Sequence, residues 1–293
     1  MIRYCGVVVL YNPEVSVPSN IDTYLKHLSK LYVIDNSEKI NLDVVNQLSG
    51  NDLVEYINLN GNKGLANALN IGCEKAILEG FDYILTMDQD SKFENDAVGR
   101  MISFIESNET DIYSIVSPNV ASIYTEDEGS EEKVAYTQIS DPMKNVEKNW
   151  VMTSGSLMNL NDYKNVGGFD ESLFIAHIDI DIGVKFNKLG KKIIQLGNAL
   201  IYQRFGNSKP KKLLWKTVHP SYASPVRTYY LFRNQKYLEK KWKGYKGFIG
   251  VHLYKFFIKI VIYEPDKVEK IKMALKGLQH ARRNFMGPYK DSL

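Results

Sequence analysis

Apolar runs and helically spaced apolar residues alternate along the first two thirds of the chain. Tyr4–Tyr11 is a continuous apolar run, which is typical of a strand covered on both faces. Leu31–Ile34 and Leu53–Leu59 predict two more strands. Apolar positions from Leu65 onward recur at helical spacing, and Gly80 is expected to end that helix.

The same alternation continues beyond residue 80. A strand ends at Asp88, and Pro118 is expected to stop another strand at Ile112–Val116, because proline has no N–H to donate. The other expected elements are a helix near Asp96–Glu106, extended chain at Val151–Leu160, a short helix at Asn161–Val166 and a strand at Lys191–Gln203. This order predicts an α/β fold with a mainly parallel sheet and helices on both faces.

Charge separates the chain into two parts. From Arg204 to the end there are 21 Lys and Arg against 5 Asp and Glu (+16), and the first 203 residues have 16 against 29 (−13), which sum to +3. Three basic helices are expected, at Tyr222–Trp242, Phe248–Tyr263 and Pro265–Arg283. We therefore expect an α/β domain over residues 1–210, with halves 1–92 and 93–210, and a basic helical region over 211–293.

The cysteine content and the absence of targeting patterns indicate the kind of compartment in which the protein is expected. Cys5 and Cys73 lie in apolar, periodic contexts, so they are expected to be buried thiols of a reducing compartment and not a disulfide or a zinc site. No signal-peptide cleavage pattern and no run of about 20 apolar residues is present. The basic region indicates an anionic partner, such as a membrane surface, a phosphorylated lipid or a nucleic acid, and a well-solvated helical surface is the alternative.

Two acidic residues end the strand before residue 91. Side chains alternate along a strand, so Asp88 and Asp90 point to one side and Gln89 points away. Carboxylates at the carboxyl end of a buried strand lie where open α/β sheets bind ligands, and oxygen ligands suit Mg²⁺ or Mn²⁺. A simple strand-ending turn is the alternative.

Two other strand ends carry polar residues. The turn Asn60–Gly64 precedes a helix whose N-terminal N–H groups could bind phosphate, although an ordinary tight turn is favoured on local grounds. Asp35 ends the second strand, where it could contact a nucleoside or form an Asx turn.

A third acidic cluster follows Gly167-Gly168. Asp179 starts a predicted helix, where it could act as the N-cap, and Asp181 follows in the first turn, where the helix dipole would stabilise its carboxylate. Asp179 could also serve as a general base, which is compatible with capping. His177 precedes them and is expected to be a packed or supporting group. Further along, His219 could complete a metal shell, and the arginines of HPSYASPVRTYYLFRN could clamp phosphate.

The segment Phe248–Tyr263 is apolar on nearly every side. Its only polar residues, His252, Lys255 and Lys259, form one narrow stripe. Such a helix suits a membrane surface, and packing on its own domain with the stripe outward is the equally weighted alternative.

Together these motifs resemble the inverting, GT-A-type glycosyltransferases of family 2, and within them rhamnosyltransferases of polysaccharide assembly. The match covers most of residues 1–240. Members often have an acidic residue at the position of Ala176 and Glu at the position of Asp181. The segments that carry the resemblance are Val7–Pro13, Val33–Glu38, Asn62–Gly72, Ile84–Ser91, Thr153–Asn159, Gly167–Asp181 and Tyr229–Asn234.

With the resemblance, the expected site residues fall into groups. Donor contacts are expected from Tyr11, Asn12, Asp35, Asn62, Lys63, Gly64, Asn67, Asp88, Gln89 and Asp90. Acceptor contacts are expected from Gly155, Ser156 and His177, and phosphate contacts from Arg227 and Arg233. A Mn²⁺ or Mg²⁺ ion is expected on Asp90, Asp88 and His219, with catalysis by Asp179 and with Asp181 as the second candidate.

The resemblance implies transfer of a sugar from a nucleotide-diphosphate donor to a saccharide or lipid-linked saccharide, in capsule or related polysaccharide synthesis. L-Rhamnose from dTDP-rhamnose is favoured, and UDP-hexoses, UDP-galactofuranose or an inactive membrane-associated scaffold remain alternatives. The protein is expected in the cytoplasm at the inner face of the plasma membrane. A dehydrogenase is disfavoured because no glycine fingerprint follows the first strand, and a nucleic-acid partner because the N-terminal part is acidic.

Overall fold

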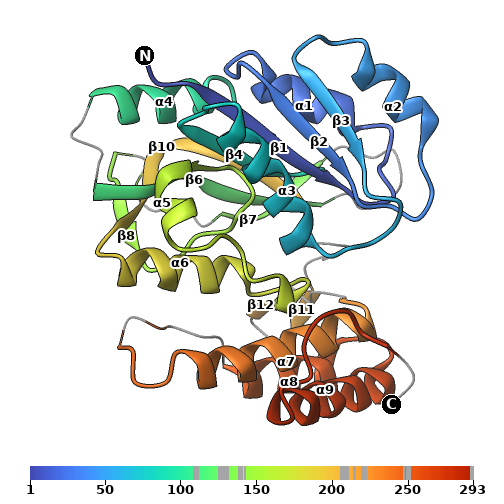
Figure 1. Ribbon diagram of the computed structural model, residues 1–293. Coiled ribbons are helices and arrows are strands. Elements are labelled where there is room, and N and C mark those ends of the chain that lie inside the picture. Colours follow the sequence, from blue (N-terminus) through green and yellow to red (C-terminus); the bar gives the residue numbers. More distant parts are fainter. Residues whose placement is uncertain are drawn as a thin grey trace.

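A computed structural model describes residues 1–107, 112–124, 132–137, 141, 143–204, 211–213, 216–218, 223–246, 248 and 252–290. An α/β body is followed by a layer of C-terminal helices (Figure 1). The strands are β1 Tyr4–Leu10, β2 Leu31–Asp35, β3 Val54–Asn58, β4 Tyr83–Asp88, β5 Ser91–Phe93, β6 Tyr113–Tyr124, β7 Lys133–Thr137, β8 Val146–Lys148, β9 Ser156–Asn159, β10 Lys192–Arg204, β11 Lys211–Leu213 and β12 Lys216–Val218. The helices are α1 Val17–Leu25, α2 Leu42–Ser49, α3 Leu65–Leu78, α4 Ala97–Ser107, α5 Leu160–Asn165, a 3-10 turn Glu171–Leu173, α6 Ile178–Lys188, α7 Pro225–Lys241, α8 Leu253–Tyr263 and α9 Lys267–Arg282.

The main sheet has the strand order β3-β2-β1-β4-β9-β6-β10-β5, with β7 beside β6 and β8 beside β10. The first four strands are parallel, so Asp35 and Asp88 lie at the same edge. β9 is inserted antiparallel between β4 and β6, and β10 runs parallel to β6. The predicted α/β fold is confirmed, with a parallel first half and a mixed second half.

Pro118 does not end its strand, so that prediction is wrong. β6 continues through Pro118 to Tyr124, and β10 shifts register opposite it, between Leu196 and Leu200. The Gln195 side chain donates to the Pro118 carbonyl at 3.0 Å. The bulge accommodates a residue that cannot donate a ladder hydrogen bond.

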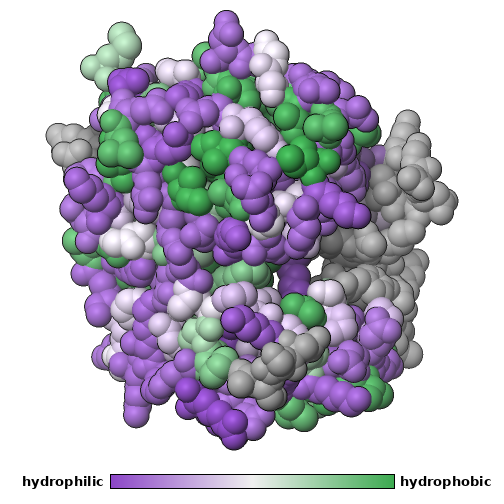
Figure 2. Space-filling view, turned by 45° about the vertical axis from the view of Figure 1, so that its right-hand side comes forward, coloured by the Kyte–Doolittle hydropathy of each residue, from purple (hydrophilic) through white to green (hydrophobic). Residues whose placement is uncertain are grey.

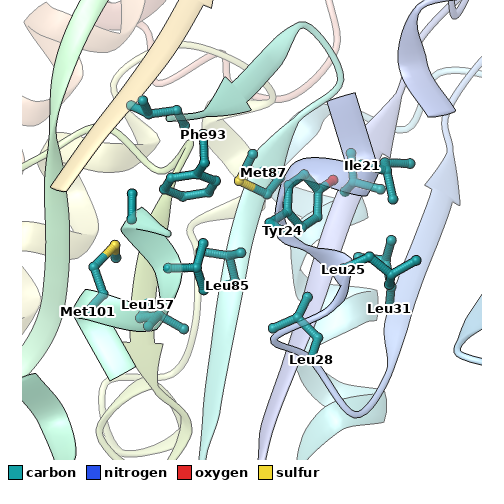
Figure 3. Close-up of a cluster of buried hydrophobic side chains, with 14 of the residues drawn as sticks. Ile21, Tyr24, Leu25, Leu28, Leu31, Leu85, Met87, Phe93, Met101 and Leu157 are labelled. Atoms are coloured by element: carbon teal, nitrogen blue, oxygen red, sulfur yellow. The ribbon is translucent and has the colours of Figure 1, made fainter. Parts of the chain in front are cut away.

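Alternating side chains of the strands build one core on each face of the sheet. One core packs under α1, α2 and α4 (Figure 3), where Tyr24 and Phe93 meet edge to face with ring centroids 6.2 Å apart. The other packs under α3, α5 and α6 and contains the buried thiols of Cys5 and Cys73. Because both faces are filled, the carboxyl edge of the sheet is a rigid platform for the site.

The C-terminal part forms the three predicted helices. Leu238 of α7 joins the second core of the body, and α7 and α9 approach so closely that a Cβ at Gly277 would lie 2.5 Å from the Tyr229 carbonyl oxygen. The predicted domain boundary at residue 210 falls beside 205–210, outside the described residues, and stays a prediction. Across the described ranges, no helix is long and apolar enough to cross a membrane.

Candidate active site

Asp88 is held at the carboxyl end of β4 by one side chain just before β9 and one side chain of β10. Its backbone N–H donates to Ser154 Oγ at 3.1 Å, and Gln203 Nε2 donates to its Oδ2 at 2.9 Å. Ser154 Oγ in turn donates to Ser91 Oγ at 2.9 Å. Sequence analysis missed both residues, because the pairing of β9 with β4 brings Ser154 to this edge and the pairing of β10 with β5 and β6 brings Gln203 there.

Asp88, Asp90 and Asp179 form an electrostatically unbalanced cluster. Burial raises the pKa of Asp88 to about 7, and the charges of Asp90 and Asp179 raise it further against the opposing effect of Arg227. Asp90 is exposed to solvent on one side, but desolvation by the surrounding protein still raises its pKa, which Arg227 and Arg204 partly offset. The structure therefore brings Arg227 to the predicted acidic pair.

The donor set of this cluster fits a hard divalent cation. Its carboxylates are oxygen ligands whose mutual repulsion a cation would relieve, and the neighbouring buried Gln203 Oε1 has no hydrogen-bond partner in the described chain. No group of three or more metal-ligating side chains occurs among the described residues. A cation held here would therefore need ligands from water or substrate. The predicted third ligand, His219, lies outside the described residues.

Asp179 lies in the first turn of α6, next to the strand-end acids. Its side chain is half-buried, and its Oδ1 accepts a hydrogen bond from the Ile180 N–H at 2.9 Å. Burial raises the pKa of Asp179 to about 6, against the opposing effect of backbone hydrogen bonds. A partly accessible carboxylate with this pKa is suited to accept a proton near neutral pH.

His177 caps α6 in a left-handed conformation, at φ 62°. Phe174 and Ala176 also have positive φ, so three strained residues lie just before the helix. His177 is 8% exposed, and its Nδ1 has no hydrogen-bond partner among the described residues. Burial lowers the pKa of His177 to about 4, so the ring is neutral near pH 7 and one nitrogen remains available to a ligand.

Asp181 is placed differently from Asp179. It is fully buried, and its Oδ1 lies 2.8 Å from Lys241 Nζ and accepts from Trp242 Nε1 at 2.9 Å. These contacts join α6 to the end of α7. Its Oδ2 is buried without a hydrogen-bond partner among the described residues and lies 3.5 Å from Lys185 Nζ, so Asp181 has mainly structural contacts and its catalytic role stays a prediction.

Arg233 also has a structural position. It is fully buried in α7, and its guanidinium donates to the carbonyls of Ser172 (3.2 Å), Leu173 (3.0 Å) and Gly287 (2.5 Å). Beside it, Asn234 Nδ2 donates to the Leu173 carbonyl at 2.9 Å. The prediction that Arg233 binds phosphate is wrong, since its donors hold the segment that leads to α6.

The turn before α3 is closed by the chain itself. The Leu65 N–H donates to the Phe174 carbonyl at 2.7 Å, and the Gly64 N–H donates to Asn62 Oδ1 at 3.0 Å. Gly64 has φ 93°, and a Cβ there would lie 2.6 Å from the Phe174 ring. These N–H groups are not free for phosphate, so the ordinary-turn alternative holds, and the exposed residues of the turn are Asn60, Asn62 and Lys63.

The segment after β1 is tied to the ends of both β4 and β2. Gln89 Oε1 accepts from the Tyr11 N–H at 2.8 Å, and Gln89 Nε2 donates to the Tyr11 carbonyl at 3.1 Å. Ser37 Oγ accepts from the Asn12 N–H at 2.8 Å. A depression of about 470 Å³ lies beside this loop and is lined by Asn12, Pro13 and residues 39–43.

Two other predicted residues have internal partners. Asp35 is fully buried. Its carboxylate accepts from the Ser37 N–H at 2.9 Å, in an Asx turn, and from the Tyr56 hydroxyl at 2.7 Å. Its contact with the nucleoside of the donor stays a prediction. Asn67 Nδ2 donates to Glu171 Oε2 at 3.0 Å.

Gly155 and Ser156 are buried where β9 begins. A Cβ at Gly155 would lie 2.7 Å from Ile201, and Ser156 Oγ donates to the Met152 carbonyl at 2.7 Å. Neither residue is exposed, so their contact with an acceptor stays a prediction. Their tight packing supports the neighbouring Ser154.

Both parts of the molecule contribute charge to the site. Figure 2 shows an opening between the α/β body above and the C-terminal helices below. α7 approaches the site from the helical side with Arg227, which lies in its first turn and is exposed. A ligand on the acidic cluster would therefore contact both parts.

Comparisons with known proteins agree with this architecture. Residues 7–169 match the family described as Glycosyl transferase family 2. The chain is 25% identical over 242 residues to the dTDP-rhamnosyl transferase RfbF of Shigella flexneri, covering 80% of this chain and 79% of that protein.

Solved structures share the fold. A structure of GalNAc-T7 with UDP, GalNAc and Mn²⁺ superposes with a TM-score of 0.60 at 15% identity, covering 97% of this chain and 56% of that one. A structure of S. aureus TarS 1–349 with UDP-GlcNAc gives 0.52 at 14% identity, covering 97% and 73%. At these identities the likeness shows a common fold.

Proposed function

The chain belongs to glycosyl transferase family 2, and on that premise we propose that it moves a sugar from a nucleotide-diphosphate donor to a hydroxyl of a saccharide or lipid-linked saccharide, with inversion at the anomeric carbon. The observation that carries the proposal is the unbalanced cluster of Asp88, Asp90 and Asp179 at the carboxyl edge of the sheet, beside Arg227. This cluster holds negative charge that a cation and a positively charged helix end could share with a diphosphate.

We propose Asp90 and Asp88 as the ligands of a Mn²⁺ or Mg²⁺ ion. When bound, such an ion neutralises the leaving diphosphate. Ser154 and Gln203 keep Asp88 in place, and Arg227 adds a positive charge from α7. Asn62 and Lys63, in the turn before α3, are exposed polar residues that could also contact the donor.

Asp179 is the proposed general base. A sugar hydroxyl has a pKa far above neutral, so a carboxylate must take its proton as the bond to the anomeric carbon forms. The neutral ring of His177 has an unpartnered Nδ1, which supports a contact with the acceptor. Direct displacement with the base and the leaving group on opposite faces gives inversion.

The favoured donor is dTDP-rhamnose, which is supported by the likeness to a dTDP-rhamnosyl transferase. UDP-hexoses and UDP-galactofuranose are the other candidates, and two of the structural neighbours contain UDP or a UDP-sugar. The depression beside Asn12 and residues 39–43 is the proposed place for the nucleoside. A lipid-linked acceptor would place the reaction at the inner face of the plasma membrane.

The test is a donor panel with purified protein. Release of dTDP or UDP and the mass of the glycosylated acceptor are measured with dTDP-rhamnose, UDP-glucose and UDP-galactofuranose, with and without Mn²⁺. We expect metal-dependent turnover of dTDP-rhamnose. Binding of the nucleotide without turnover of any donor would favour the inactive scaffold.

A further inference from the structure

Among the C-terminal helices of the described chain, α8 exposes the most large apolar side chains. One side of it packs on α7 and α9 through Ile260, Phe256 and Leu253. At 100° per residue, the opposite side is an arc of about 140° that is entirely apolar. The arc consists of Tyr254 (61% exposed), Phe257 (37%), Ile258 (50%), Val261 (44%) and Ile262 (51%).

The charges beside this arc have one sign. Lys255 and Lys259 are exposed and lie together along one border of the arc, one helical turn apart. No acidic residue occurs within α8. The C-terminal part that contains it carries +16, by 21 basic against 5 acidic residues. An apolar face with a basic border is complementary to an anionic lipid surface.

The helix is held firmly in this orientation. After α8 the chain turns at Glu264, and Glu264 Oε2 lies 2.8 Å from Lys270 Nζ with both side chains buried. This ion pair fixes the end of α8 to the first turn of α9, and α9 packs on α7. The apolar arc is thus part of a rigid surface, as a docking face requires.

We propose that the outer face of α8, defined by Tyr254, Phe257, Ile258, Val261 and Ile262 with Lys255 and Lys259, docks on an anionic membrane surface. The helix of 11 residues lies in the interface and does not span it. Through α7, whose Asn234 and Arg233 hold the segment before α6, the docked helices keep a fixed relation to Asp179. The surface deepens the proposed function, because it would bring the site to lipid-linked acceptors.

The experiment is co-sedimentation of the full chain with vesicles, without donor or acceptor. Vesicles of phosphatidylcholine are compared with vesicles that also contain phosphatidylglycerol. The double variant Ile258→Glu/Ile262→Glu tests the apolar arc, and Lys255→Ala/Lys259→Ala tests the basic border. Leu78→Glu, at an 86% exposed leucine of α3 on the body, is the matched control.

We expect binding to anionic vesicles at least roughly tenfold tighter than to neutral ones. Loss of the two lysines should weaken binding to anionic vesicles by about thirtyfold (about 2 kcal/mol). Added salt should also weaken this binding, because it screens the charges. The isoleucine variant should lose binding to both vesicle types, and Leu78→Glu should bind normally. Unchanged binding of the isoleucine variant, or equal loss in the control, would overturn the proposal.

Two readouts separate this proposal from the proposed function. Turnover of dTDP-rhamnose with a water-soluble acceptor should be normal in both α8 variants, which also reports that they fold. Asp90→Ala should lose turnover and still bind vesicles. The wild type could instead fail to bind vesicles and form a dimer in sedimentation analysis that Ile258→Glu/Ile262→Glu dissociates. In that case a second copy of the chain covers this face, and the membrane proposal fails.

Discussion

Two acidic residues in the first turn of α6 have opposite environments. Asp179 is half-buried with one backbone partner, and its pKa is raised to about 6, whereas Asp181 is fully buried against Lys241 and Trp242. The same contrast separates Asp88 and Asp90 from the turn at Gly64, whose N–H groups are satisfied within the chain. Polar groups left electrostatically unbalanced mark the chemistry, and satisfied ones mark the scaffold.

The largest expected effect is at the unbalanced cluster. Asp90→Ala removes an exposed carboxylate at the proposed metal site, so metal-dependent turnover should be lost by at least about 10³-fold, while the melting temperature barely changes. Donor turnover and thermal unfolding are measured side by side. Wild-type turnover that persists in EDTA, or a fully active variant, would contradict the metal role.

Asp179→Asn separates base catalysis from helix stability. The amide can still accept the Ile180 N–H bond but cannot take a proton, so the rate should fall by about 10²–10⁴-fold with an unchanged melting temperature. Donor binding, measured by the ligand-induced rise in melting temperature, should survive. Near-normal transfer by this variant would remove Asp179 from the mechanism.

The pH profile tests the same residue without changing its neighbours. Because burial raises the pKa of Asp179 to about 6, the rate should fall about tenfold per pH unit below that value. The sign for stability is the reverse: a raised carboxyl pKa favours the protonated folded protein, so this stabilisation is lost as pH rises through about 6. An acid limb that persists unchanged in the residual activity of Asp179→Asn would assign it to another group.

The sequence predicted the elements that depend on local patterns. Strand ends at Asp35 and Asp88, the helix start at Asp179 and the three basic helices all follow from periodicity and turn residues. What it could not predict depends on distant contacts: Gln203 reaches Asp88 across 115 positions, and the Phe174 carbonyl closes the start of α3. Neither partner carries a local signal, because each is chosen by the folded topology.

The same limit applies to two charged residues. Asp181 and Arg233 were assigned by residue type near plausible motifs, yet their partners on α7 and in residues 172–173 bury them. Whether a charged side chain is buried depends on which helices and loops pack against it in the folded protein. Sequence spacing places a residue on an element but does not show whether its side chain is already satisfied.

The smallest effect on chemistry is expected at Asp181. Asp181→Asn removes the charge that faces Lys241 and Lys185 but keeps an oxygen for the Trp242 indole N–H. Lys241 retains Asp170 at 2.7 Å, and Lys185 Nζ still donates to the Gly168 carbonyl at 2.6 Å. Because one salt bridge remains, the loss should be about 1–3 kcal/mol in the free energy of unfolding, below the cost of a charge left wholly unpaired. Turnover per folded molecule should stay within about threefold of the wild type, far from the loss expected of a general base. Urea unfolding and turnover on the same preparation check both numbers. A stable Asp181→Asn protein with a base-type rate loss would reverse the comparison and make Asp181 the base.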